Sequence, residues 1–269
     1  MSGSSRDPWA LLGTRTTARI ALGRAGVSLP TREVLSFALA HARARDAVHA
    51  KLDRAALAAE LVTLGLTSVD IESRAADRAH FLRRPDLGRT LSETSRAALV
   101  AAARPCELAI MVGDGLSATA VARQVPALLA ALLPLVTAMK LRVGPVAIAE
   151  HARVALGDEV GVLLGARIVA VLIGERPGLS AADSLGVYLT YAPRPGVTDA
   201  ERNCLSNIRP EGLAPAAAAR SLAWLIEAAL ARGLTGVGLK DDSDAVDLGD
   251  GATPGVVSRI VPAGSDPWV

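Results

Sequence analysis

A glutamate and an arginine follow a run of residues with the composition of a buried strand. The segment "VAVLIGERPGL", residues 169–179, begins with apolar residues and continues into Glu175, Arg176 and a Pro–Gly turn. A surface hairpin would alternate polar and apolar residues, and this segment does not. A carboxylate in such a place can act as an acid or base, or can accept hydrogen bonds from a ligand. We therefore expect Glu175 and Arg176 at the mouth of a ligand site.

A second segment, "VGDGLSA" at residues 112–118, is similar to the glycine-rich fingerprint of dinucleotide-binding proteins. Its two glycines and its final alanine take the positions of G-x-G-x-x-A between an apolar run and a helical one. Two observations weigh against a dinucleotide. Asp114 would lie beside the pyrophosphate, and the acid that ends the next strand, Glu150, comes 32 residues after Ala118 instead of about 20. A structural turn is favoured, and a stand-alone nucleotide-binding oxidoreductase remains the alternative function.

A third polar stretch, "RNCLSNIRPEGLAP" at residues 202–215, has the character of a loop. It contains Cys204, Ser206, Asn207 and Arg209. These residues fit a buried cysteine with an Asx turn, and they fit equally well the rim of a ligand site beside a sheet.

Known catalytic and metal-binding patterns are absent from the sequence. The four histidines are not at metal-ligand spacings, and no Ser–His–Asp order, H-E-x-x-H or C-x-x-C occurs. His151 is expected to begin a helix. The two cysteines make neither a disulfide framework nor a metal cluster. The sequence therefore indicates no self-contained catalytic set.

The spacing of apolar residues predicts the elements that position these groups. From about residue 14 to residue 103 the spacing is helical, and from about residue 107 short apolar runs alternate with helical ones. This alternation predicts an α/β fold, a Rossmann-like and mostly parallel sheet with helices on both faces, preceded by an N-terminal helical segment. The runs expected as strands are "LAIMVGDG", "VGPVAIAE", "RIVAVLIGERPG", "SLGVYLTYAP" and a final "TGVGL", and the helices between and after them are expected at 117–139, 151–164 and 213–232. Ligands bind such sheets at the carboxyl ends of the strands.

Three zones follow from this pattern. Residues 1–103 form the N-terminal helical segment, residues 104–240 form the Rossmann-like domain, and residues 241–269, rich in Asp, Gly, Pro and Ser, are expected to be a loosely ordered tail.

Composition bounds the class of protein. The chain has 269 residues, 51% of them hydrophobic and 21% charged, as in globular proteins, and its net charge of +2 gives no electrostatic reason to expect nucleic acid as a partner. The longest apolar stretch, residues 125–139, is shorter than the roughly 20 residues of a membrane span. The N-terminus lacks a charged region followed by an apolar one. We expect a cytoplasmic protein that does not enter the membrane.

Seven segments, in order along the chain, resemble the small subunit of ethanolamine ammonia-lyase. The combination of "GERPGL" and "NCLSNI" at this separation is the most specific part of the resemblance, which covers about residues 8–239. The segments are "ARIALGRAG…LPT", "RPDLGR", "GDGLS", "ARVALGDEVG", "LIGERPGL", "SLGVYLTY" and "RNCLSNI".

The resemblance implies a lyase that uses adenosylcobalamin to convert ethanolamine to acetaldehyde and ammonia. In this family the large subunit is a TIM barrel that binds the substrate and carries the radical chemistry. The small subunit covers the cobalamin on the side away from the adenosyl group, and large–small pairs assemble into a hexamer. The N-terminal helical segment is then the candidate contact with the large subunit, with packing against the chain's own α/β domain as the other interpretation.

The family's cobalamin contacts in the small subunit fall on Val154, Glu175 and Cys204, which match in residue type. The resemblance makes them cofactor-binding residues and not catalytic ones: Val154 gives packing surface, Glu175 accepts hydrogen bonds from corrin amides, and Cys204 gives a small polarizable contact. The chain has no D-x-H-x-x-G motif, in agreement with a cofactor that keeps its own base on cobalt. The N-terminal extension associated with encapsulation in a bacterial microcompartment is short here, which leaves that location open. A partner protein that binds no cofactor is a third interpretation.

Overall fold

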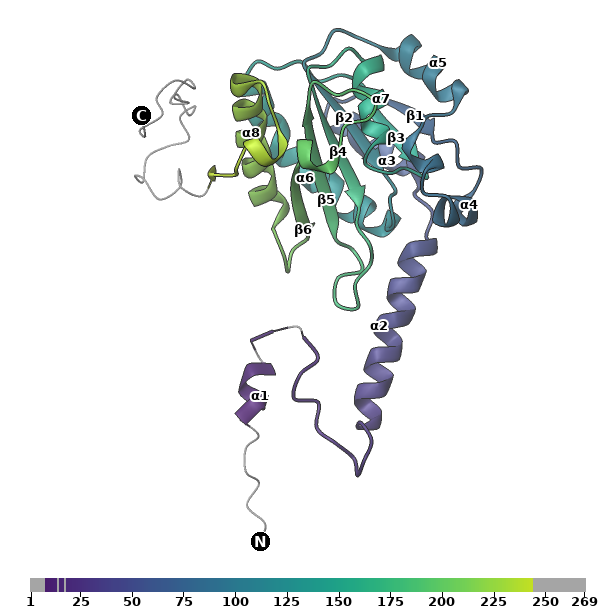
Figure 1. Cartoon of the computed structure of the whole chain (residues 1–269), viewed down its shortest axis with the longest axis vertical. Coiled ribbons are helices and arrows are strands. Elements are labelled where there is room, and N and C mark those ends of the chain that lie inside the picture. The colour runs from purple at the N-terminus through teal and green to yellow at the C-terminus, as the bar shows by residue number, and fades with distance from the viewer. Residues whose placement is uncertain (1–7, 14, 17, 244–269) are drawn as a thin grey trace.

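A six-stranded sheet forms the centre of the molecule (Figure 1). The computed structural model describes residues 8–13, 15, 16 and 18–243. The strands are β1 (Ser68–Glu72), β2 (Leu108–Gly113), β3 (Val146–Glu150), β4 (Ile168–Gly174), β5 (Leu185–Tyr191) and β6 (Asn203–Ile208). The helices are α1 (Pro8–Gly13), α2 (Thr31–His49), α3 (Arg54–Thr63), α4 (Arg78–Arg83), α5 (Glu93–Ala102), α6 (Ala118–Ala138), α7 (Leu156–Leu163) and α8 (Pro215–Arg232), with short 3-10 turns at Leu87–Arg89, Asp199–Glu201 and Gly236–Gly238.

The sheet is mixed and mostly parallel, which confirms the predicted α/β class. The strand order is β1-β3-β2-β4-β5-β6. The first four strands are parallel, and β5 runs antiparallel to both of its neighbours. The carboxyl ends of β2, β3 and β4 therefore meet at one edge of the sheet, and the end of β6 lies at the same edge.

Helices cover both faces of the sheet. On one face α3, α6 and α8 pack against alternate strand residues such as Ile110, Ile148 and Leu172. On the other face α5 and α7 pack against the intervening residues, such as Met111 and Val171. Because β2 and β4 are buried along their whole length, they read as continuous apolar runs, as expected of central parallel strands.

Helix α6 is the longest helix of the described residues and lies in the core. It begins at the N-cap Ser117, whose hydroxyl accepts a hydrogen bond from the backbone N–H of Ala120. By length and composition alone it could cross a membrane. Its apolar side chains, Leu128, Leu129 and Leu132 among them, are buried in the cluster shared with the sheet and α8, as in the core helix of a globular domain.

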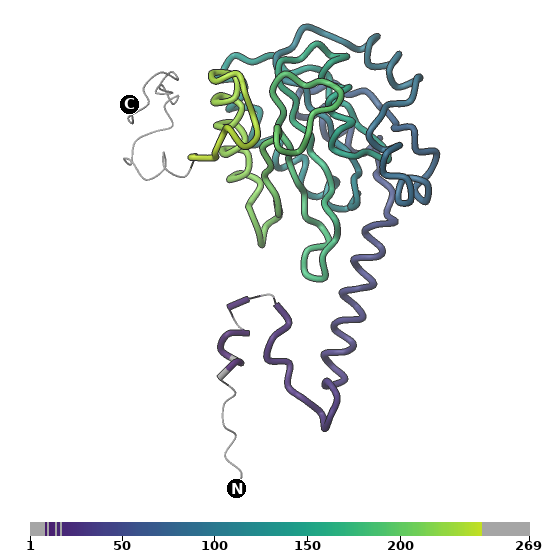
Figure 2. The backbone as a smooth tube through the Cα atoms, in the orientation of Figure 1, coloured from purple at the N-terminus to yellow at the C-terminus, as the bar shows by residue number. Residues whose placement is uncertain are grey.

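The N-terminal arm extends away from this α/β body. Helix α2 projects from the body, and the chain before it turns back at the far end of the helix (Figures 1 and 2). The Arg19 guanidinium carbon lies 5.5 Å from the centre of the Phe37 ring on α2. Among the described residues, the contacts that hold α2 to the body are at its C-terminal end: Ala47 is buried, and the Arg78 guanidinium donates a 2.8 Å hydrogen bond to the carbonyl of Val48.

Four expectations from the sequence pattern need correction. The N-terminal part is not entirely helical, since β1 adds an edge strand to the sheet beside β3. Residues 203–208 are strand β6 rather than a loop, and "TGVGL" is a 3-10 turn rather than a strand. His151 lies in a turn at φ 57°, and the helix after it begins at Leu156. The predicted tail is outside the described residues from residue 244 onward.

Candidate functional site

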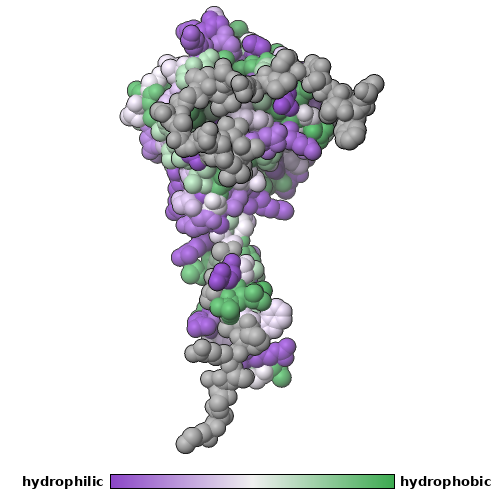
Figure 3. All heavy atoms as spheres, turned by 90° about the vertical axis from the view of Figure 1, so that its left-hand side faces the viewer, coloured by the Kyte–Doolittle hydropathy of each residue, from purple (hydrophilic) through white to green (hydrophobic). Residues whose placement is uncertain are grey.

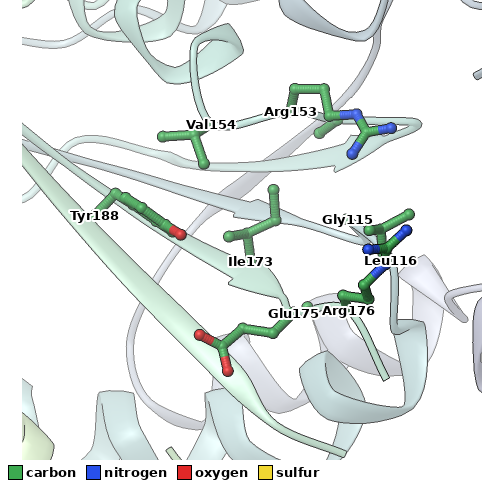
Figure 4. Close-up of a pocket in the computed structure, with 10 residues that line it drawn as sticks. Gly115, Leu116, Arg153, Val154, Ile173, Glu175, Arg176 and Tyr188 are labelled. Atoms are coloured by element: carbon green, nitrogen blue, oxygen red, sulfur yellow. The ribbon is translucent and has the colours of Figure 1, made fainter. Parts of the chain in front are cut away.

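A cavity of about 380 Å³ opens at the carboxyl edge of the sheet. Four segments line it: the turn after β2, the loop after β3, the end of β4 and the middle of β5 (Figure 4). The lining residues are Gly115, Leu116, Ala152, Arg153, Val154, Ile173, Gly174, Glu175, Arg176 and Tyr188. The strand end singled out from the sequence therefore borders a concavity, and both Val154 and Glu175 line it.

Glu175 is the first residue after β4, and its carboxylate is held in place from one side. Its Oε2 atom accepts a hydrogen bond from the Ser184 hydroxyl and another, of 3.2 Å, from the backbone N–H of Asn207. The carboxylate lies over Gly186, where an added Cβ would be only 3.1 Å from Oε1. Within the described part of the chain no hydrogen bond reaches Oε1. One oxygen fixes the side chain, and the other is available as an acceptor for a ligand.

Tyr188 and Cys204 form a partly exposed surface beside this carboxylate. They are paired across β5 and β6, on the face of the sheet that α7 covers further along. Tyr188 is partly buried and Cys204 is exposed. Burial, followed by the neighbouring Cys204, raises the pKa of Tyr188 to about 12, so the phenol is neutral at physiological pH.

The thiol of Cys204 is also kept neutral. Although the residue as a whole is exposed, partial desolvation of its thiol is the largest cause that raises the pKa. A hydrogen bond with Tyr188 opposes this rise, and the negative charges of Glu175 and Asp199 add to it. Because the thiolate is the reactive form of cysteine, this environment suits contact with a ligand and not nucleophilic catalysis.

Val154 faces the cavity from the loop that joins β3 to α7. It is partly buried and packs against the apolar cluster on the α7 face. In Figure 4 its side chain lies across the cavity from Glu175, with Ile173 between them. Val154, Glu175 and the Tyr188–Cys204 pair thus offer an apolar contact, a free acceptor and a flat sheet surface around one opening.

The glycine-rich turn at Gly113–Ser117 serves close packing. An added Cβ at Gly115 would lie 2.3 Å from the carbonyl oxygen of Gly174, and the backbone N–H of Leu116 donates a 2.9 Å hydrogen bond to that same oxygen. The glycine therefore lets the turn rest on the end of β4. This role favours the structural interpretation of the fingerprint-like segment over a pyrophosphate cradle.

Asp114, in the same turn, is a buried structural acid. Its carboxylate accepts hydrogen bonds from the backbone N–H of Ala152, at 3.0 Å, and from the Arg78 guanidinium, at 3.1 Å. Burial raises the pKa of Asp114, and these two donors oppose that rise. The interactions tie the loops after β2 and β3 together, which fixes two walls of the cavity.

The structure brings together some of the predicted site residues and separates others. Glu175, Arg176 and Val154 line the cavity, whereas Cys204 does not line it and is paired with the lining residue Tyr188. Glu150 instead forms an ion pair of 3.5 Å with Arg54. Tyr188 and Arg153 line the cavity but were not predicted, although both stand inside segments that carry the family resemblance.

Comparison with known protein families gives one consistent result. The family model described as ethanolamine ammonia-lyase light chain matches residues 6–240. A protein of Bradyrhizobium diazoefficiens named ethanolamine ammonia-lyase small subunit is 58% identical over 240 residues, covering 88% of this chain and 92% of its own.

Other relatives with the same name agree with this match. The protein of Rhodopseudomonas palustris is 57% identical over 229 residues, covering 85% of this chain and 88% of its own. The protein of Azotobacter vinelandii is 49% identical over 259 residues, covering 94% and 96%. The similarity spans the whole α/β body and every segment that lines the cavity.

Proposed function

Because the chain belongs to the ethanolamine ammonia-lyase small-subunit family, we propose that it binds adenosylcobalamin at the cavity beside β4. It acts with a large catalytic subunit, and the complex converts ethanolamine to acetaldehyde and ammonia. Large–small pairs assemble into a hexamer, and the cofactor lies between the two chains of a pair.

The observation that carries this proposal is the convergence of Val154, Glu175 and Cys204. They lie on three different segments, between 21 and 50 residues apart in sequence. Val154 and Glu175 line the cavity, and Cys204 is the cross-strand partner of Tyr188, which lines it as well. The free Oε1 atom of Glu175 is a strong acceptor for an amide N–H, and corrin side chains carry such amides. Tyr188 and Cys204 offer the flat, mostly apolar surface that a macrocycle needs.

The size of the cavity supports a shared site. Pockets that enclose a drug-sized ligand span roughly 300–1,000 Å³, and this one has about 380 Å³. A corrin with its amide side chains and nucleotide is larger than such a ligand, so this chain can cover only part of it. The remaining surface is available to a second subunit.

The residues of this chain bind and orient the cofactor. Bound adenosylcobalamin supplies radical chemistry, which we assign to the large subunit. Glu175 holds a corrin amide, Val154 and Tyr188 exclude water from the macrocycle, and Cys204 contributes a neutral contact. None of them transfers a proton in this role, which agrees with the protonated states of Tyr188 and Cys204 at physiological pH.

The N-terminal arm is our candidate for the contact with the large subunit. Helix α2 exposes a set of large apolar side chains, which Figure 3 shows as hydrophobic atoms on the narrow part of the molecule. They are Val34, Leu35, Phe37 and Leu39, each 48–64% exposed. Exposed apolar patches of this kind mark interaction sites, and a small subunit implies a larger one to cover them.

The proposal is tested with the co-expressed pair of subunits. After addition of adenosylcobalamin and gel filtration, we expect the complex to keep the visible spectrum of cobalamin and to release acetaldehyde from ethanolamine, while the small subunit alone is inactive. A pair that binds cobalamin but releases no acetaldehyde contradicts the lyase function. If NAD or NADP raises the melting temperature and cobalamin does not, the oxidoreductase alternative is favoured; if neither ligand acts, a partner protein without a cofactor is favoured.

Replacing Glu175 by alanine should weaken retention of cobalamin. Losing a charged hydrogen-bond partner costs about 1–3 kcal/mol, or roughly 5- to 150-fold in Kd. Equilibrium dialysis of the purified complex measures this, with Glu93→Ala as the matched control, since Glu93 is an exposed acid on α5. Equal Kd values for the wild type and Glu175→Ala would show that the carboxylate only shapes the turn.

A further inference from the structure

The cavity has positively charged side chains at one end and a carboxylate toward the other. In Figure 4 the guanidinium groups of Arg153 and Arg176 lie at the end near Gly115 and Leu116, whereas Glu175 and Tyr188 lie toward the opposite end. In the proposed function, Glu175 at the acidic end accepts from corrin amides, and Tyr188 packs against the macrocycle. Neither of these neutral partners explains two arginines at the other end.

Arg153 is held rigidly at this end. Its guanidinium carbon lies 4.3 Å from the centre of the Phe81 ring, an arrangement that favours a fixed, stacked arginine. Its backbone N–H donates a 2.8 Å hydrogen bond to the carbonyl of Gly88. A Cβ at Gly88 would be 2.8 Å from Phe81 and 3.0 Å from Cγ of Arg153. The lack of a side chain at Gly88 thus makes room for the stack.

The guanidinium of Arg153 is only partly satisfied by the protein. Its Nε atom is buried and has no hydrogen-bond partner in the described part of the chain. Burial is the main cause that lowers its pKa, and the positive charges of Arg78, Arg89 and Arg176 add to that effect while Asp114 opposes it. A cation in this environment gains from an added anion.

The carboxylates near Arg153 do not supply this anion, so a ligand would have to supply it. Arg78 is engaged by Asp114 at 3.1 Å. Arg89, Arg153 and Arg176 form no ion pair with a carboxylate among the residues that the structure describes. Arg176 is exposed and follows Glu175 directly, so its side chain is free to approach a ligand in the cavity.

We propose that Arg153 and Arg176 form an anion site that takes the phosphodiester of the cobalamin nucleotide. The inference rests on the proposed cofactor. The corrin amides are neutral, and the phosphodiester is the one permanent anion among the peripheral groups of cobalamin. Arginine matches phosphate oxygens with two parallel N–H donors. Glu175 at one end and the arginine pair at the other set the rotation of the cofactor in the site.

The test separates the phosphate from the rest of the ligand. Kd values for the co-purified complex are measured by spectrophotometric titration with cobalamin, with cobinamide, which lacks the nucleotide, and with cobinamide phosphate, which restores only a phosphate. We expect wild type to bind cobinamide phosphate more tightly than cobinamide, and we expect that preference to shrink as salt rises. Adenosine monophosphate serves as a probe for a site that takes free nucleotides.

The variants are Arg153→Gln, Arg176→Gln and the pair combined. The double variant should lose about 10- to 100-fold in affinity for cobalamin and cobinamide phosphate, while cobinamide binding stays within a few-fold of wild type and so reports an intact site. Arg153→Lys should recover part of the loss. The matched control is Arg167→Gln, an exposed arginine just before β4, at the other edge of the sheet.

The other outcomes bear on different statements. Equal losses for cobinamide and cobinamide phosphate, or unchanged Kd values in the double variant, overturn the anion site but leave cobalamin binding in place. The site is supported if adenosine monophosphate binds the wild-type complex and competes with cobalamin but not with cobinamide. The assignment to the cofactor is overturned if the complex binds the nucleotide tightly and does not bind cobalamin. A wild-type complex that binds none of the corrin ligands contradicts the proposed function itself.

Discussion

Replacing Asp158 by alanine is expected to lower the free energy of unfolding by about 3–5 kcal/mol, the usual cost of breaking a buried ion pair. Asp158 on α7 and Arg202 before β6 have side chains that are each 2% exposed. The two guanidinium nitrogens Nη1 and Nη2 donate to the two carboxylate oxygens, both at 2.7 Å. Removing the carboxylate leaves a buried cation whose remaining ion-pair partner is the exposed Asp199, at 3.8 Å from Nε, and this loss is the source of the large effect.

The pair also connects the two sides of the proposed site. Arg202 donates to the Thr190 hydroxyl on β5, at 2.8 Å, and to the carbonyl of Val197, at 3.0 Å. Cys204 follows Arg202 by two residues, and Val154 precedes α7 by two. The ion pair therefore fixes the antiparallel strands of the sheet to the helix that follows the Val154 loop.

Chemical denaturation of the full chain measures the effect of Asp158→Ala. The surface pair Arg84–Asp86 gives the matched control, because both side chains are more than half exposed; Asp86→Ala should leave the unfolding midpoint close to that of the wild type. The combined variant Asp158→Leu with Arg202→Met should recover most of the stability lost in Asp158→Ala. A loss below about 1 kcal/mol in Asp158→Ala would show that Arg202 finds water or another acceptor.

The central part of the fold could be predicted because its strands are buried on both faces. β2 and β4 are apolar at every position, a pattern that indicates a covered parallel sheet. The edge strands β1 and β6 have weaker patterns of apolar residues. In β1 only Ile71 is buried, and in β6 a shift of register separates the two buried residues, Leu205 and Ile208, by three positions instead of two. Neither edge strand shows the regular alternation that identifies a half-buried strand.

Only those site residues that have a local sequence signal could be predicted. The sequence predicts a site at Glu175 because a charge follows a buried strand. The importance of Arg153 depends on Phe81 and Gly88, which are more than 60 residues away in sequence. The pairing of Tyr188 with Cys204 depends on the register of β5 and β6. Such relations are set by tertiary packing, and no local spacing of residues contains them.

The glycine before Glu175 is expected to be as sensitive as the buried ion pair. A Cβ at Gly174 would lie 2.1 Å from the carbonyl oxygen of Ser117 and 2.7 Å from that of Asp114. Both obstacles are backbone atoms, which cannot swing aside as a flexible side chain can. Overpacking a core costs typically 1–3 kcal/mol and occasionally more, and we expect Gly174→Ala to lose about 3 kcal/mol or more of the free energy of unfolding.

The same segment supplies the control for Gly174→Ala. At Gly178, four residues further on, the nearest atoms to an added Cβ are 3.9 Å away, so Gly178→Ala should be neutral or stabilise the protein by up to about 1 kcal/mol. Thermal and chemical unfolding of both variants, with cobalamin titration of each complex, measures the contrast. Because Gly174 and Gly115 bring the turn after β2 onto the end of β4, Gly174→Ala should weaken cobalamin binding as well. Equal stability of the two variants would mean that the turn moves freely from the end of β4, and the cavity could then not be the rigid site that the arginine pair and Glu175 require.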